Sequence, residues 1–83
     1  MLSFTSPWCA ACKKVHAHAE FMEQAYDAIT FGTIDISTNP KTPAQLQVFS
    51  IPTIIFFKNG AEVTRLNGTI TDKDLRKGLD TIL

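Results

Sequence analysis

Hydrophobic and polar residues follow one another along the chain with a period that switches between that of a strand and that of a helix. Residues 1–4 are short and mostly apolar and predict a first strand. Over residues 9–28, apolar side chains recur at steps of three and four, which predicts a helix with one apolar face; this face consists of Cys12, Val15, Ala19, Met22 and Tyr26. Residues 29–36 alternate and are rich in β-branched side chains, so they predict a second strand.

The middle of the chain predicts a short helix followed by a β-hairpin. Two prolines occur in the segment that leads into a short helical piece over residues 43–48. The continuous apolar run over residues 51–58 is typical of a strand that is covered on both faces. Asn59-Gly60 is a strong hairpin signal, and the alternating residues 62–68 after it predict the antiparallel partner strand.

The C-terminal residues 69–83 predict a third helix. Thr71 can cap its N-terminus, and Asp74 three residues later comes close to completing a capping box. The inner face of this helix is formed by Leu75, Leu79 and Ile82. The element order β-α-β-α-β-β-α predicts an α/β fold in which a four-stranded mixed sheet has helices on both faces. We expect one domain that spans residues 1–83.

The composition is that of a small globular domain with no specialised surface charge. The chain has 83 residues, of which 45% are hydrophobic, so it can form a core without a disulfide framework. Eight basic residues balance eight acidic ones, which argues against nucleic-acid binding. A membrane-spanning helix needs about 20 consecutive apolar residues, and no apolar run in this sequence is that long. The N-terminal residues do not have the pattern of a secretory signal. We therefore expect a cytosolic protein that binds neither nucleic acid nor a membrane.

The only two cysteines, Cys9 and Cys12, form a C-x-x-C motif at the junction of the first strand and the first helix. The N-terminus of a helix has unpaired N–H groups and a partial positive charge, and both stabilise a thiolate. Cys12 lies one helical turn further on, where its sulfur can reach that of Cys9. This spacing predicts a redox pair in which Cys9 attacks a target disulfide and the more buried Cys12 resolves the mixed disulfide. No cofactor is needed for this chemistry.

Three other interpretations of the cysteines remain open. They could be two buried thiols in a helix, or they could belong to a metal site. A mononuclear zinc site needs two more ligands, and His16 and His18 are near in sequence. However, His18 projects about 200° further round the helix than His16, so one helix cannot direct both at one ion. A metal or cluster shared by two C-x-x-C pairs in a dimer is a third interpretation.

Several segments resemble the thioredoxin family. "PWCAACKK" resembles the family's W-C-x-x-C-K segment, "IDISTNP" its I-D-x-N-P stretch, and "VFSIPTIIFFKNG" its I-P-T segment and following strand. "LNGTITDKDLRKGLDTIL" is similar to its last strand, glycine and C-terminal helix. The resemblance covers residues 2–83. It implies a thioredoxin-like fold and an oxidoreductase that reduces protein disulfides, with electrons from a thioredoxin reductase or another thiol donor.

The resemblance also implies a role for individual residues. Cys9 and Cys12 match the attacking and the resolving cysteine. Pro52 matches a cis-proline that faces the disulfide and turns the backbone of Ile51 toward the cysteines, where it can pair with an extended substrate. Gly68 matches a glycine at the rim of the substrate groove. Trp8, Ile51, Pro52 and Gly68 would then form a shallow apolar binding face. The alternative for Pro52 is an edge-strand or turn proline.

The sequence also departs from the usual family pattern. The chain starts directly at the strand before the motif, so the resemblance implies a minimal protein without the family's N-terminal strand and helix. Ala10-Ala11 stands where thioredoxins have Gly-Pro, which would make the protein more oxidising. Ser3 stands in place of a buried acidic residue that helps to deprotonate the resolving cysteine. We hypothesise that His16 accepts this proton; the alternative is a solvated histidine at the helix margin.

Three other functions are weighed against protein-disulfide reduction. A glutaredoxin-like exchange with glutathione is less favoured, because the sequence has I-P-T rather than T-V-P and lacks an evident cationic cluster for the carboxylates of glutathione. An isomerase-like or oxidase-like role would follow from a more oxidising motif. A non-catalytic docking module would use Trp8, Ile51 and Pro52 as an apolar patch, but the intact C-x-x-C motif argues against it. We expect a monomer whose partners are proteins with disulfide bonds.

Overall fold

The computed structural model describes residues 1–83, and its helices and strands follow one another in the predicted order. The strands and helices are β1 (Leu2–Thr5), α1 (Ala10–Ala25), β2 (Gly32–Asp35), α2 (Lys41–Gln45), β3 (Thr53–Lys58), β4 (Ala61–Asn67) and α3 (Asp72–Asp80). The strands form one sheet in the order β2-β1-β3-β4. β1 is parallel to β2 and antiparallel to β3, and β4 is antiparallel to β3. The predicted mixed sheet with three helices is confirmed.

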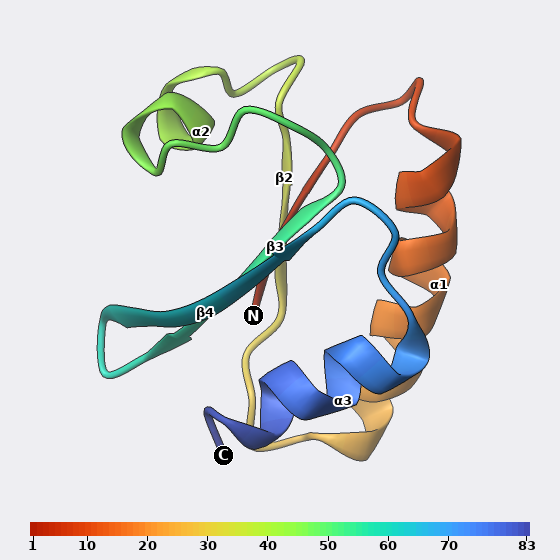
Figure 1. Ribbon diagram of the computed structural model, residues 1–83, viewed down its shortest axis with the longest axis vertical. Helices are drawn as coiled ribbons and strands as arrows, with labels where there is room; N and C mark the ends of the chain where they lie inside the picture. Colours follow the sequence, from red (N-terminus) through yellow and green to blue (C-terminus); the bar gives the residue numbers. More distant parts are fainter.

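The helices lie on the two faces of this sheet. α1 and α3 pack together on one face, and α2 lies on the opposite side (Figure 1). Successive strand residues point to opposite faces, so Ile54 and Phe56 of β3 face the core under α1 and α3, while Ile55 between them faces the other way. All three are fully buried, which explains why β3 is a continuous apolar run. The other members of the main core are Met1, Val15, Met22, Ile70, Leu75 and Leu79.

The apolar face predicted for the first helix is the face that α1 buries, but the helix ends earlier than predicted. It stops at Ala25 rather than at residue 28, because Tyr26 leaves the helical region with φ −120° and ψ 65°. The backbone N–H of Tyr26 still binds the carbonyl of Met22 and closes the last turn. α1 is the longest helix, and no helix in the chain is both long and apolar enough to cross a membrane.

Two other predicted segments are displaced or shortened. β2 begins at Gly32 rather than at residue 29, because Ile29 is still part of a turn in which its N–H binds the carbonyl of Tyr26. α2 begins at Lys41 and ends at Gln45, earlier than the predicted 43–48. Gln47 follows it with φ 56°, a left-handed conformation that stops a helix.

The two local signals in the C-terminal half are confirmed. Asn59 and Gly60 connect β3 and β4 with φ values of 54° and 79°, as a two-residue type I′ hairpin turn requires. The hydroxyl of Thr71 accepts a hydrogen bond from the N–H of Asp74 at 3.2 Å, and the Asp74 carboxylate accepts one from the N–H of Thr71 at 3.0 Å. This capping box starts α3 at Asp72, as the predicted Thr71 cap requires, and the helix ends at Asp80, before the end of the predicted segment 69–83.

Candidate active site

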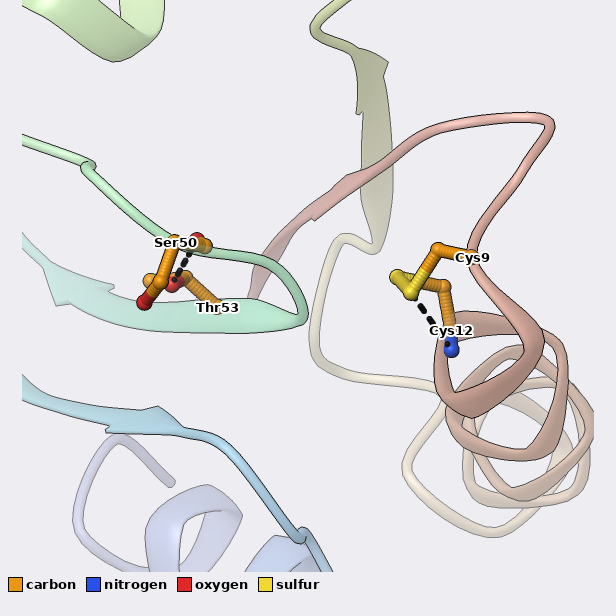
Figure 2. The surroundings of a disulfide bond; sticks show 4 residues. All are labelled: Cys9, Cys12, Ser50 and Thr53. Atoms are coloured by element: carbon orange, nitrogen blue, oxygen red, sulfur yellow. Dashed lines mark hydrogen bonds between the residues drawn. A yellow bond between two sulfur atoms is a disulfide. The ribbon is translucent and has the colours of Figure 1, made fainter.

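Cys9 and Cys12 form a disulfide at the start of α1. Their Cα atoms are 5.2 Å apart. Cys9 is the N-cap residue of the helix, and its Sγ accepts a hydrogen bond from the N–H of Cys12 at 3.1 Å (Figure 2). Cys9 is partly exposed, whereas Cys12 is only 3% exposed. Cys9 is thus the more exposed residue of the pair, and Cys12 lies inside the protein.

The charges around Cys9 favour an anion. The first turn of α1 contains no acidic residue, so its unpaired N–H groups are not neutralised by a carboxylate. Lys13 and Lys14 follow in the same helix, and neither is part of an ion pair, because the ion pairs of the protein involve His16, His18, Arg65 and Arg76. When the disulfide is reduced, the unpaired N–H groups at this end of the helix favour a thiolate at Cys9.

A loop that leads into β3 faces the disulfide. The Ile51–Pro52 peptide bond in this loop is cis. The hydroxyl of Thr53 donates to the carbonyl of Ser50 at 2.7 Å and closes the loop, and the disulfide projects from α1 toward it (Figure 2). Pro52 is buried and lines a small cavity together with Cys12. The sequence-predicted Pro52 therefore lies beside the cysteine pair.

The segment after β4 is tied to the same loop. Gly68 has φ 77°, and its N–H donates to the carbonyl of Pro52 at 3.2 Å. No atom lies close to where a Cβ of Gly68 would be, so this position is open on its outer side. Pro52, which shares a cavity with Cys12, and Gly68, which binds Pro52, thus come from parts of the chain distant from the cysteines.

Exposed apolar side chains precede Cys9 and Pro52 in the sequence. Trp8 directly precedes Cys9 and is 80% exposed. Ile51 is partly exposed. Phe49, three residues before Pro52, is 88% exposed and was not singled out from the sequence. The signal that would have identified it is a large aromatic residue in a loop, outside any helical or strand periodicity.

His16 lies near the buried cysteine but at the protein surface. Its Nε2 is 3.1 Å from a carboxylate oxygen of Glu20, and its side chain is 59% exposed. His16 is also one of the residues that line the cavity of about 10 Å³ beside Cys12, whose polar lining residues include Ser3 and Thr33. His18 instead contacts Asp72 at the start of α3, with 2.9 Å between Nδ1 and Oδ1. The two histidines therefore engage different carboxylates.

Comparison with known proteins identifies the family to which this chain belongs. The family model described as Thioredoxin matches residues 1–81. The chain belongs to the thioredoxin family. It is 36% identical to thioredoxin X, chloroplastic, of Arabidopsis thaliana over all of this chain and 47% of the plant protein. It is 36% identical to the thioredoxin of Chlamydia caviae over 89% of this chain and 72% of that protein. It is 41% identical to a Mycobacterium tuberculosis thioredoxin over 82% of this chain and 60% of that protein.

Solved thioredoxin structures have the same fold. The thioredoxin of Fasciola hepatica superposes with a TM-score of 0.92 at 26% identity, over 99% of this chain and 78% of that one. Mitochondrial thioredoxin 3 of Saccharomyces cerevisiae in its oxidized form gives a TM-score of 0.89 at 26% identity, over 96% of this chain and 74% of that one. This thioredoxin-family chain spans about half to three quarters of the length of these curated relatives.

Proposed function

We propose that this protein is a thiol-disulfide oxidoreductase that reduces disulfides of other proteins through Cys9 and Cys12. The observation that carries the proposal is the asymmetry of the cysteine pair. Cys9 is partly exposed and its Sγ accepts a hydrogen bond from the N–H of Cys12 at 3.1 Å, while Cys12 is only 3% exposed. Membership of the thioredoxin family supports the same reaction.

The reaction runs in two exchange steps. In the first, the Cys9 thiolate attacks one sulfur of the substrate disulfide, a Cys9–substrate disulfide forms, and the other substrate sulfur leaves as a thiolate. In the second, Cys12 loses its proton and attacks the Sγ of Cys9, so the mixed disulfide breaks and the Cys9–Cys12 disulfide forms. The substrate gains two electrons and two protons. An external dithiol, such as that of a reductase, then supplies two electrons and two protons that reduce the Cys9–Cys12 disulfide again.

The substrate-binding face in this proposal consists of Trp8, Ile51, Pro52 and Gly68. Trp8 and Ile51 supply apolar surface beside Cys9, and Gly68 leaves its outer side open. The backbone of Ile51 pairs with an extended stretch of substrate, which holds the target disulfide against Cys9 as a short added strand would.

His16 is the proposed acceptor of the Cys12 proton. His16 and Cys12 line the same cavity, which is about the size of one water molecule. The Nε2 of His16 lies 3.1 Å from a carboxylate oxygen of Glu20. His16→Ala should slow the second exchange step and change its pH dependence, measured by rapid mixing of the reduced protein with a peptide disulfide. His18→Ala is the matched control, and an unchanged profile in His16→Ala would contradict this role.

The partners and setting follow from the proposed chemistry. A protein that reduces disulfides must itself be kept reduced, so we place it in a reducing compartment such as the cytosol, with a thioredoxin reductase or another thiol donor as its electron source. We propose that residues 1–83 act as one domain and as a monomer, because the substrate face needs no residue from a second copy.

Trapping the mixed disulfide tests the proposed function. Cys12→Ser, mixed with a protein disulfide, should accumulate a covalent complex through Cys9 that mass spectrometry detects and dithiothreitol releases. Cys9→Ser should form no such complex, because the remaining cysteine is buried. If neither variant forms an adduct, or if Cys12 forms it in place of Cys9, the assignment of roles is wrong.

A further inference from the structure

A pocket opens beside the disulfide, between the first turn of α1 and the segment that follows β4. Its volume is about 260 Å³. Val15 and Ile70 are buried and form its floor, and the small side chains of Ala10 and Ala11 line it on the α1 side. Lys14 lines the same pocket and is exposed. The pocket is therefore apolar at its base and carries a cation at its edge.

The pocket is continuous with the proposed substrate face. Gly68 lines it and also donates its N–H to Pro52. Ala10 and Ala11 are the two residues between the cysteines. A polypeptide whose cysteine sulfur contacts Cys9 has its next side chains only about 4–7 Å along the chain, so one of them can enter the pocket.

The charges at the pocket indicate which side chain fits. Lys14 is the only charged residue that lines it, and it has no ion-pair partner in the protein. Asp72 and Asp74, the acids of the nearby α3 N-terminus, are engaged by His18 and by the Thr71 cap. A side chain with an apolar stem and a terminal carboxylate is complementary to an apolar floor and an unpaired ammonium group.

We propose that this pocket is a specificity site that selects disulfide substrates with a glutamate within two residues of the attacked cysteine. The methylene groups of this glutamate would pack on Val15 and Ile70, and its carboxylate would pair with Lys14. The proposal rests on the exchange reaction of Cys9 and Cys12 and names the substrate class of that site. Lys14 acts on the approach of the substrate and takes no part in the exchange of sulfur bonds.

The test uses disulfide-linked homodimers of a short peptide, so that attack on either sulfur meets the same sequence. The test covers the two positions before the cysteine and the two positions after it. At each position, one peptide with Glu is compared with an otherwise identical peptide with Gln. The pre-reduced protein is mixed with each peptide, and the second-order rate constant is followed by Trp8 fluorescence. We expect the Glu peptide to react about two- to fivefold faster at one of these positions, the range that an exposed ion pair provides. The ratio should fall toward one at about 0.5 M salt.

Variants distinguish the pocket from general surface charge. Lys14→Gln should bring the Glu/Gln rate ratio to one, and Lys14→Glu should invert it. Ala11→Leu keeps the lysine but fills part of the pocket, so it should also lower the ratio. Lys13→Gln is the matched control, because it removes the same charge one residue away but does not line the pocket, and it should retain the ratio.

The outcomes separate this inference from the proposed function. If both peptides are reduced at equal rates at every position, the specificity site is wrong while the redox function stands. If Lys13→Gln lowers the ratio as much as Lys14→Gln does, diffuse charge and not the pocket is responsible, and the proposal is overturned. If the reduced protein reacts with neither peptide and with no protein disulfide, the proposed function itself fails.

Discussion

α1 and α3 pack on the same face of the sheet, yet their N-termini are built from opposite chemistry. α3 begins with the Thr71–Asp74 capping box and has two acidic residues in its first turn. α1 begins with the sulfur of Cys9 as its cap and has no acidic residue in its first turn. Both ends present the same kind of unpaired backbone N–H groups.

The difference shows two uses of one backbone feature. At α3, side-chain oxygens and carboxylates satisfy the N–H groups, and the gain is stability of the folded protein. At α1, the N–H groups are left for a sulfur that must become an anion when the disulfide is reduced. A carboxylate there would compete with the thiolate for the same positive end of the helix. We expect the two ends to respond differently to the same kinds of substitution.

Cys9→Ser should have the largest effect. Serine is a good N-cap residue, so α1 should begin at the same position. Disulfide exchange should fall to the rate of the uncatalysed reaction, because the accessible sulfur is gone. Turnover with a protein disulfide and urea unfolding, both compared with the reduced wild-type protein, measure the two effects. If the variant retained the full function of the protein in its cell, the docking-module interpretation would replace the redox one.

Ala11→Glu makes the start of α1 resemble that of α3. The new carboxylate interacts favourably with the helix end and should stabilise the reduced protein by about 0.3–1 kcal/mol, while it disfavours the Cys9 thiolate. Alkylation of Cys9 by iodoacetamide near neutral pH should therefore slow about two- to fivefold. The control is Ala17→Glu, which adds the same charge to an exposed position in the middle of the helix. Equal slowing in both variants would mean that the helix end has no special role.

Thr71→Ala tests the opposite end of the comparison. Loss of the cap should lower the free energy of unfolding by about 1 kcal/mol and leave the reaction of Cys9 with a small disulfide unchanged. Thr71→Ser keeps the hydroxyl and is the matched control. A change in the exchange rate of Thr71→Ala would show that the two helix ends are coupled.

The contribution of the capping box to stability depends on pH through the carboxylate of Asp74. The backbone N–H of Thr71, assisted by its hydroxyl, holds the pKa of Asp74 below its ordinary value of 3.8. Because the folded protein favours the ionised form, Asp74 contributes its full stabilisation above that ordinary value and loses it as the pH falls through the lower folded pKa. The difference in unfolding free energy between the wild-type protein and Asp74→Asn should therefore shrink at acidic pH. A constant difference would contradict the role of the carboxylate.

The features that were predicted well are those that depend on neighbours in the sequence. Asn59-Gly60 supplies the left-handed backbone of the hairpin within two residues, and Thr71 and Asp74 cap α3 within one turn. The predicted end of α1 was wrong because Tyr26 makes a contact with a distant part of the chain. Its hydroxyl donates to a carboxylate oxygen of Asp80 at 3.1 Å, a contact between residues 54 positions apart. Such a contact leaves no periodic signal in the sequence around Tyr26.

The residues of the candidate site also fall into those that local sequence predicted and those that it did not. The C-x-x-C spacing and its place before a helix were evident from the sequence, because one helical turn separates the sulfurs. The roles of Ile51, Pro52 and Gly68 came only from a family resemblance. The place of Lys14 beside a pocket was missed, because its local sequence does not differ from that of an ordinary surface lysine.

The sequence by itself determined the elements, their order and a pair of cysteines that can form a disulfide, since periodicity, turn residues and helix caps act over a few residues. Only the tertiary structure decided that the Pro52 loop and Gly68 meet at that disulfide, and that Val15 and Ile70 form the floor of a pocket with Lys14 at its edge. These residues come from the first helix and from segments about 40 to 60 positions later. Their meeting depends on how the sheet and helices pack around a common core, which no local pattern in the chain encodes.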